Sequence, residues 1–102
     1  MRGRALAEIE LSEEADNDLI EIWLYGYAEF GAETADHYGQ SFQKAFDLLS
    51  RYPFAGEARR DIDPTIRSLG HNSHHIYYDV EGTIIRVRRI LHKAVDPSHH
   101  LI

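Results

Sequence analysis

The chain has 102 residues, a formal net charge of −6 and no cysteine, and these values exclude several classes of protein. A chain of this length forms one domain around one modest core, so we treat residues 1–102 as a single domain. Without cysteine there are no disulfides, thiol nucleophiles or thiolate zinc sites, which is compatible with the reducing cytoplasm. No apolar segment approaches the roughly 20 residues that span a membrane. An acidic chain is also a poor general binder of nucleic acid.

The charge is distributed unevenly along the chain. Residues 1–50 contain three basic and eleven acidic side chains, for a net charge of −8, whereas residues 51–102 contain eight basic and six acidic ones, for +2. We interpret most of the acids as solvated helix faces, and we expect a mildly basic surface on the second half of the chain.

The first half of the chain predicts one strand and two helices. Residues 5–11 alternate loosely between polar and apolar, as in a strand. Ser12 is a typical N-cap for a first helix, and Gly31 suits the left-handed residue that ends it. Apolar spacings of three and four continue through a second helix over about 32–51, which Pro53 ends. So short a connection predicts an antiparallel helical hairpin.

The second half of the chain predicts strands. After a polar loop over 53–64, residues 65–69, 74–80 and 83–92 are rich in β-branched and aromatic side chains, and Glu81-Gly82 is typical of a hairpin turn. The order of elements is therefore β-α-α-β-β-β. We expect a two-layer α+β fold, with the helical hairpin packed on an antiparallel-rich sheet.

Aromatic side chains on these elements are the predicted core. The helical pattern assigns this role to Trp23, Tyr27, Tyr38 and Phe42. Tyr77 and Tyr78 are neighbours on a strand and point to opposite faces, so we expect one in the core and the other accessible. Trp23 and Tyr78 are taken as structural residues.

Basic side chains on the last strands are the candidate binding surface. They are Arg67, Arg86, Arg88, His92 and Lys93, and they suit an acidic or phosphate-bearing partner, with a merely solvated strand face as the alternative. Simple alternation places Arg86, Arg88 and His92 on one face and Arg89 on the other, with Ile85, Val87 and Leu91. In that apolar row Arg89 needs a carboxylate or carbonyl partner, so we predict that it is a structural hub.

Motifs of enzymes and metal sites are missing from the sequence. There is no phosphate-binding glycine loop, no HExxH motif and no nucleophile elbow. The adjacent His74 and His75 point to opposite faces of a strand and cannot share a metal ion. We predict no catalytic residue, no cofactor and no metal site.

Six short fragments resemble a known family. They are, in order, Leu11-Ser12-x-x-Ala15-x-x-Asp18-Leu19-x-x-Ile22-Trp23-x-Tyr25; Gly31, Ala35 and Tyr38; Pro53, Gly56 and Arg67-Ser68-Leu69; Ser73-His74-x-Ile76-Tyr77-Tyr78; Arg89-Ile90-Leu91-His92; and Asp96-Pro97-x-x-His100-Leu101. In this order and spacing they resemble the ParE toxins of the RelE/ParE superfamily, over nearly the whole chain.

The resemblance implies a toxin of a type II toxin–antitoxin system with the β-α-α-β-β-β fold. Toxins of the ParE type inhibit DNA gyrase, and thereby replication, without being enzymes. A ParD-like antitoxin would bind the chain in a hetero-oligomer in the cytoplasm, and operator DNA would be contacted only through that antitoxin. The basic residues would then bind the antitoxin or the target, with acidic groups of the antitoxin near the arginines.

Two other functions are considered. A RelE-like, ribosome-dependent mRNA interferase would need Arg67, Arg89 and His92, with His99 or His100 as acid or base, but the chain has few cations for phosphate contact. An inactive relative that only binds an antitoxin is the other.

Two residues depart from the family pattern. Asp79 stands where many relatives have arginine, and Arg88 stands where an aliphatic residue is usual. The two departures are either a compensating charge exchange between neighbouring strands or a change in the partner surface.

Overall fold

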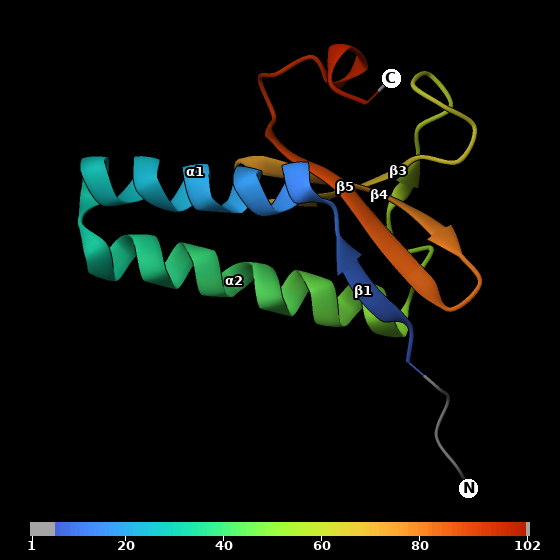
Figure 1. The fold of residues 1–102 in the computed structure, drawn as a ribbon, viewed down its shortest axis with the longest axis horizontal. Helices are drawn as coiled ribbons and strands as arrows, with labels where there is room; N and C mark the ends of the chain where they lie inside the picture. The colour runs from blue at the N-terminus through green and yellow to red at the C-terminus, as the bar shows by residue number, and fades with distance from the viewer. Residues whose placement is uncertain (1–5, 102) are drawn as a thin grey trace, which may run out of the picture.

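The computed structural model describes residues 6–101 and shows a helical hairpin packed against a sheet (Figure 1). The elements are β1 (Glu8–Leu11), α1 (Glu13–Phe30), α2 (Ala32–Arg51), β2 (Glu57–Ala58), β3 (Arg67–His71), β4 (His74–Glu81), β5 (Ile84–His92) and a short 3₁₀ helix, η1 (Pro97–His99). The predicted α+β class and order of elements are confirmed. The two-residue strand β2 is an addition, because it lies in the segment predicted to be a loop. Ala5, the predicted start of the first strand, lies outside the described residues.

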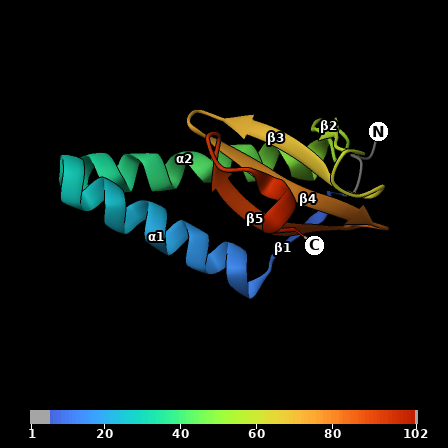
Figure 2. The ribbon, with the colours of Figure 1, turned by 90° about the horizontal axis from the view of Figure 1, so that it is seen from above.

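The sheet has five strands in the order β1-β5-β4-β3-β2. Only the β1–β5 pair is parallel, so the prediction of an antiparallel-rich sheet is confirmed. β1 pairs with β5 only as far as Leu11 opposite Val87, which leaves the second half of β5 at an edge of the sheet. α1 packs beside this edge, as two perpendicular views show (Figures 1 and 2).

Local signals define the hairpin as predicted. The Ser12 hydroxyl accepts a hydrogen bond from the Ala15 backbone N–H at 3.0 Å and donates one to the Arg88 carbonyl at 2.8 Å, so one side chain caps α1 and ties it to β5. Gly31, with φ of 92°, joins the two helices in a conformation that favours glycine.

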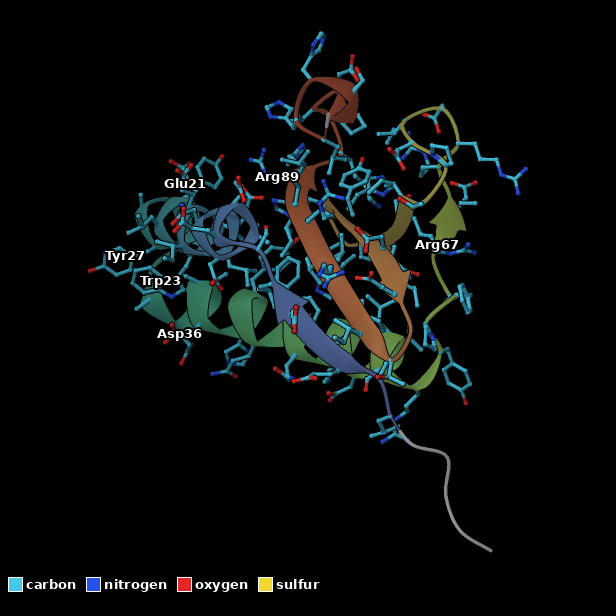
Figure 3. All side chains as sticks on the ribbon, turned by 45° about the vertical axis from the view of Figure 1, so that its right-hand side comes forward. Glu21, Trp23, Tyr27, Asp36, Arg67 and Arg89 are labelled. Atoms are coloured by element: carbon cyan, nitrogen blue, oxygen red, sulfur yellow. The ribbon has the colours of Figure 1, made fainter. Side chains whose placement is uncertain are left out.

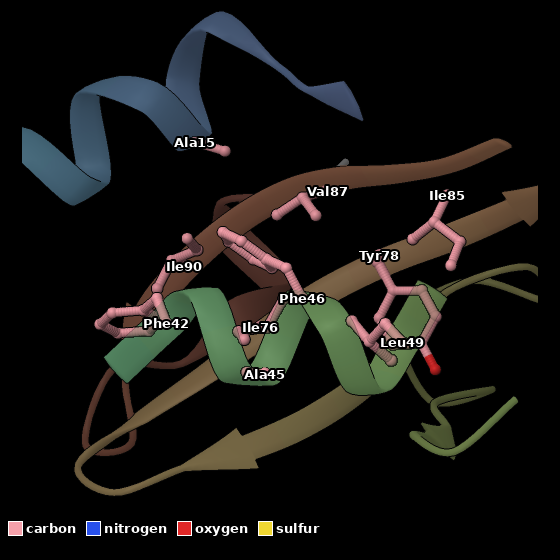
Figure 4. Close-up of a cluster of buried hydrophobic side chains, with 10 residues drawn as sticks. All are labelled: Ala15, Phe42, Ala45, Phe46, Leu49, Ile76, Tyr78, Ile85, Val87 and Ile90. Atoms are coloured by element: carbon pink, nitrogen blue, oxygen red, sulfur yellow. The ribbon is translucent and has the colours of Figure 1, made fainter. Parts of the chain in front are cut away.

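The main core lies between α2 and the sheet (Figure 4). It contains Ala15, Phe42, Ala45, Phe46, Leu49, Ile76, Tyr78, Ile85, Val87 and Ile90. A second cluster on the other face of the sheet joins Ile66, Tyr77, Leu91 and Leu101. Tyr77 and Tyr78 are therefore both buried, at 2% and 0% exposure, which corrects the prediction that one would be accessible. The reason is that the end of the chain, with Leu101, packs over the face of the sheet that carries Tyr77.

A β-bulge at Arg88 changes which side chains share a face of β5. Tyr78 pairs with Val87 and Tyr77 pairs with Arg89, so Arg88 is an extra residue without an opposite partner. Beyond it the alternation reverses: Ile90 joins Val87 in the main core, and Leu91 lies in the second cluster. The prediction that Arg89 and Leu91 share a face with Ile85 and Val87, and His92 with Arg86, is therefore wrong: Arg89 pairs with Tyr77 and lies on the face of the second cluster.

Two of the predicted structural aromatics make specific hydrogen bonds. The buried Tyr78 hydroxyl donates to the Pro53 carbonyl and accepts from the Gly56 N–H, both at 2.8 Å. Trp23 Nε1 donates to Asp36 Oδ1 at 2.7 Å, so Trp23 pins α1 to α2.

The other predicted core aromatics differ in their exposure. Phe42 is buried and Tyr38 is half-buried. Tyr27 stacks on Trp23 but is 51% exposed, so its assignment to the core is wrong. The reason is that Tyr27 lies on a side of α1 that neither α2 nor the sheet covers.

Candidate partner-binding groove

A groove of about 650 Å³ lies where the helical hairpin extends beyond the end of the sheet (Figures 1 and 2). It runs along α1 and is closed at one end by the β3–β4 turn and the last residues of β5. Its lining is Asp18, Glu21, Ile22, Tyr25, Gly26, Phe30, Thr34, Ala35, Tyr38, Ser73, His74, Ile90 and His92.

The lining of the groove is largely apolar. The floor of the groove is formed where α1 and α2 approach each other at the small residues Gly26 and Ala35. A methyl group on Gly26 would lie 3.5 Å from the Ala35 Cβ. Tyr25 and Phe30 stand over this floor, and each is 67% exposed. Large apolar side chains exposed beside one concave surface are typical of a protein-binding site.

The remaining surface of α1 is also unusually apolar. Ile20, Leu24 and Tyr27 are more than half exposed and follow one another at helical spacing on a second side of the helix. Ala15 is the one residue of α1 that is fully buried. α1 therefore presents much more apolar surface than its contacts with α2 and the sheet use.

Three histidines and a tyrosine form the closed end of the groove and the layer behind it. The Tyr38 hydroxyl lies 2.7 Å from His74 Nδ1, and the rings of His74 and His92 are 5.4 Å apart. His71 Nε2 lies 2.7 Å from the Ser41 hydroxyl. Burial, helped by the neighbouring His92 and His71, lowers the pKa of His74 from 6.5 to about 4. This end wall is therefore polar, with His74 uncharged at neutral pH.

Asp18 and Arg89 fix the position of α1 against β5. Two hydrogen bonds of 2.8 and 2.9 Å join the guanidinium to the carboxylate, which also accepts the Ile90 backbone N–H at 2.9 Å. The hydrogen bonds from Asp18 raise the pKa of Arg89. Asp18 is thus the carboxylate partner that the sequence predicts for Arg89, and the role of Arg89 as a structural hub stays a prediction.

Most of the predicted basic surface is engaged within the chain. Arg86 bonds to Glu81 and lies 3.8 Å from Glu10. Arg67 donates to the Gly56 carbonyl at 2.9 Å and lies over the Phe54 ring. The charge of Arg86 is thus balanced by carboxylates, whereas the guanidinium of Arg67 is held by a backbone carbonyl and an aromatic ring.

The two departures from the family pattern meet across neighbouring strands. Arg88 Nη1 lies 3.0 Å from Asp79 Oδ2. This contact is the compensating charge exchange that the sequence offered as one explanation.

The structure does not bring the predicted binding residues to one place. Arg67 pairs with Tyr78 beside the short β2 edge, whereas His92 pairs with His74 at the groove. Lys93 is exposed near Gly70, which is on the side of the sheet that carries the second cluster. Tyr78 and His74 are four residues apart on β4, or roughly 13 Å. A role in partner binding for each of these residues stays a prediction.

Comparison with known proteins identifies the family. A family model described as "ParE toxin of type II toxin-antitoxin system, parDE" matches residues 9–97. The chain belongs to the ParE toxin family. Toxin ParE1 of Mycobacterium tuberculosis is 38% identical over 93 residues, and Toxin ParE1 of Caulobacter vibrioides is 29% identical over 91 residues; each match covers 89% of this chain and 94% of the relative.

Solved structures share the fold of this ParE-family chain. The chromosomal ParDE system of P. aeruginosa matches with a TM-score of 0.75 at 21% identity, over 87% of this chain and 98% of that one. The toxin–antitoxin complex RelBE2 of Mycobacterium tuberculosis matches with a TM-score of 0.64 at 19% identity, over 86% and 99%. Both structures therefore share the helical hairpin packed on a sheet with this chain.

The sequence-based reasoning missed the residues of the groove. The sequence prediction gives Glu21, Ile22, Tyr25 and Phe30 no binding role. One signal is present in the sequence: apolar residues of 13–30 lie on more than one side of the helix, because Ile20, Leu24 and Tyr25 do not lie on the side that carries Ala15 and Leu19. A helix that is apolar on several sides needs more cover than one sheet face provides.

Among residues 6–101, no three His, Asp or Glu side chains are grouped so that they could hold a metal ion. None of the helices in this range is long and apolar enough to cross a bilayer.

Proposed function

We propose that this ParE-type toxin inhibits DNA gyrase and that a ParD-like antitoxin neutralises it by filling the groove beside α1. The single observation that carries the antitoxin site is the exposure of Tyr25 and Phe30 over an apolar floor. The gyrase target is supported by membership of the ParE family.

Neutralisation through this groove is physically reasonable. Aromatic side chains over a concave floor supply the large apolar contact area that dominates the energy of many protein interfaces. A flexible antitoxin segment that folds on contact can cover such a surface along the length of a helix. The complex would be a hetero-oligomer in the cytoplasm, and the antitoxin would provide its contact with operator DNA.

The arrangement favours action by binding over RNA cleavage. An interferase would need Arg67, Arg89 and His92 around one phosphate. Arg89 is held by Asp18, and Arg67 donates to backbone carbonyls on the far side of the sheet from the groove end. Arg89 and Arg67 thus make structural contacts within the chain, at two separate places in the fold.

Expression of the chain with and without its antitoxin tests the proposal. Expression alone should stop growth, produce filaments and induce the DNA damage response, and the purified chain should inhibit supercoiling by purified gyrase. Added antitoxin should restore both growth and supercoiling.

Two outcomes would contradict the proposal and identify a different function. Discrete cuts in translated mRNA together with uninhibited gyrase would identify an interferase. Normal growth at high expression without antitoxin would identify an inactive, antitoxin-binding relative.

A further inference from the structure

The charge of the groove differs from that of the arginine-bearing strands. Among residues 6–101, its lining contains no lysine or arginine and two carboxylates, Asp18 and Glu21. Asp18 is neutralised by Arg89, whereas Glu21 forms no ion pair with any residue of 6–101. Glu21 makes the smallest of the contributions that raise the pKa of Arg89, so its attraction to that guanidinium is weak. Glu21 therefore leaves the long wall of the groove negatively charged.

His74 does not offset this negative charge at neutral pH. Its low pKa keeps the ring uncharged, and the neighbouring His92 Nδ1 accepts a hydrogen bond from the Ala94 N–H. Figure 3 shows Glu21 on the side of α1 opposite to the one from which Trp23 reaches Asp36. Glu21 therefore lines the groove from the side of α1 that is away from the contact between Trp23 and Asp36.

Arg86 and Arg88, outside the groove, offer little to an acidic partner. Arg86 already has Glu81 and Glu10, and Arg88 has Asp79. An incoming carboxylate would have to displace an existing one, and exchanging one partner for another brings little net attraction.

The shape of the groove fits a helix. Its lining on α1 extends from Asp18 to Phe30, which is about 18 Å of helix. An added strand would need free backbone groups on the open edge of β5, but the Ile90 N–H there is bonded to Asp18. A helix of about 12 residues satisfies its own backbone groups and matches this length.

We infer that the groove takes an amphipathic helix of the antitoxin whose apolar face covers Tyr25 and Phe30 and whose lysine or arginine pairs with Glu21. This inference rests on the proposed antitoxin site and adds the sign of its charge. It reverses the expectation of acidic antitoxin groups beside the arginines: at this surface the toxin is the acid and the antitoxin supplies the cation.

A charge reversal with a matched control tests the inference. The probe is the purified full-length antitoxin encoded beside the toxin gene, titrated against wild type, Glu21→Gln, Glu21→Lys and Asp47→Lys at low and high salt. Asp47 is an exposed acid of α2 outside the groove, so Asp47→Lys changes the net charge as Glu21→Lys does. Both sites are exposed, and equal thermal melting curves will show that the variants fold.

The expected ranking of affinities is specific. Glu21→Lys should weaken binding about tenfold at low salt, Glu21→Gln about threefold, and Asp47→Lys less than about twofold. The loss caused by Glu21→Lys should shrink at high salt, because screening weakens an exposed charge pair.

Three results would overturn the inference. If Glu21→Lys binds like Asp47→Lys, Glu21 has no cationic partner. If Arg86→Glu with Arg88→Glu weakens binding strongly while Glu21→Lys does not, the partner is acidic and lies over the arginines. If the antitoxin does not bind wild type at all, the proposed function fails together with the inference.

Discussion

Asp18 of α1 and Arg89 of β5, 71 positions apart in the sequence, form a two-bond ion pair at the point where β1 stops pairing with β5. Their side chains are only 13% and 21% exposed. Asp18 also satisfies the Ile90 N–H on the uncovered edge of the sheet. One carboxylate thus ties α1 to the uncovered edge of β5, beside the groove that Asp18 also lines.

Removing the Asp18 carboxylate should destabilise the protein. Asp18→Ala leaves the Arg89 guanidinium and the Ile90 N–H without their partner in a mostly buried place, so we expect a loss of about 2–4 kcal/mol in the free energy of unfolding. Urea denaturation measures it, and Arg86→Gln in an exposed pair is the control with little effect. Equal losses for the two variants would show that Asp18–Arg89 is no stronger than a surface pair.

Tyr78→Phe should lower the free energy of unfolding by about 1–3 kcal/mol, because it leaves the buried Gly56 N–H and the Pro53 carbonyl without a partner.

Gly56→Ala should also destabilise the protein, since its new methyl group would lie 2.7 Å from the Tyr78 hydroxyl and 2.8 Å from the Ser68 carbonyl. Gly39→Ala in α2 is the control: its methyl group meets nothing closer than 4.0 Å and should stabilise the helix by roughly 0.5–1 kcal/mol. The melting temperatures of the three variants measure this difference: they should fall for Tyr78→Phe and Gly56→Ala and rise for Gly39→Ala. A Gly56→Ala protein as stable as wild type would contradict the close packing of Gly56 against Tyr78 and Ser68.

Stability should fall as the pH is lowered from 7.5 to 5. The pKa of His74 is about 4 in the folded state, below its ordinary value of 6.5, because the ring is buried among Tyr38, His71 and His92, with Asp18 partly opposing the effect. The unfolded chain therefore binds the proton more tightly between these pH values, so acid favours unfolding. We expect His74 to contribute about 1–2 kcal/mol of this loss.

His74→Gln tests the origin of that pH dependence. Glutamine can still accept a hydrogen bond from the Tyr38 hydroxyl but does not titrate, so the urea midpoint should depend less on pH than in wild type. His99→Gln, in the exposed tail outside the groove, is the matched control that also removes one histidine. An unchanged slope in His74→Gln would show that other groups cause it.

Arg88 and Asp79 should be energetically coupled. In a double-mutant cycle with Arg88→Ala and Asp79→Ala, we expect a coupling of roughly 0.5–1 kcal/mol, as for a partly exposed ion pair. Strictly additive losses would mean that the two departures from the family pattern do not compensate each other.

The helical hairpin was predictable because local residues define it. Ser12, Gly31 and Pro53 act through backbone groups within a few positions of themselves, and the observed helix bounds follow them. The β-bulge at Arg88 has no such local signal, because it depends on how β4 and β5 align. The burial of Tyr77 was also unpredictable, since it needs Leu101 from the far end of the chain.

The candidate site was less predictable than the fold. The sequence indicated a cluster of arginines but not the acids beside them, so Arg86 and Arg88 looked more available than they are. It indicated an apolar first helix but not how far that helix extends past the sheet. The exposure of Tyr25 and Phe30 depends on this overhang, which is a property of the packed layers.

Rescue of growth by the antitoxin tests the groove most directly. Wild-type toxin and a Tyr25→Asp, Phe30→Asp variant are each expressed with and without the antitoxin, and growth is measured. We predict that the antitoxin restores growth with wild type but not with the variant, because two carboxylates in the groove exclude its apolar face while the target surface stays intact. Full rescue of a variant that is as toxic as wild type would contradict the groove as the antitoxin site.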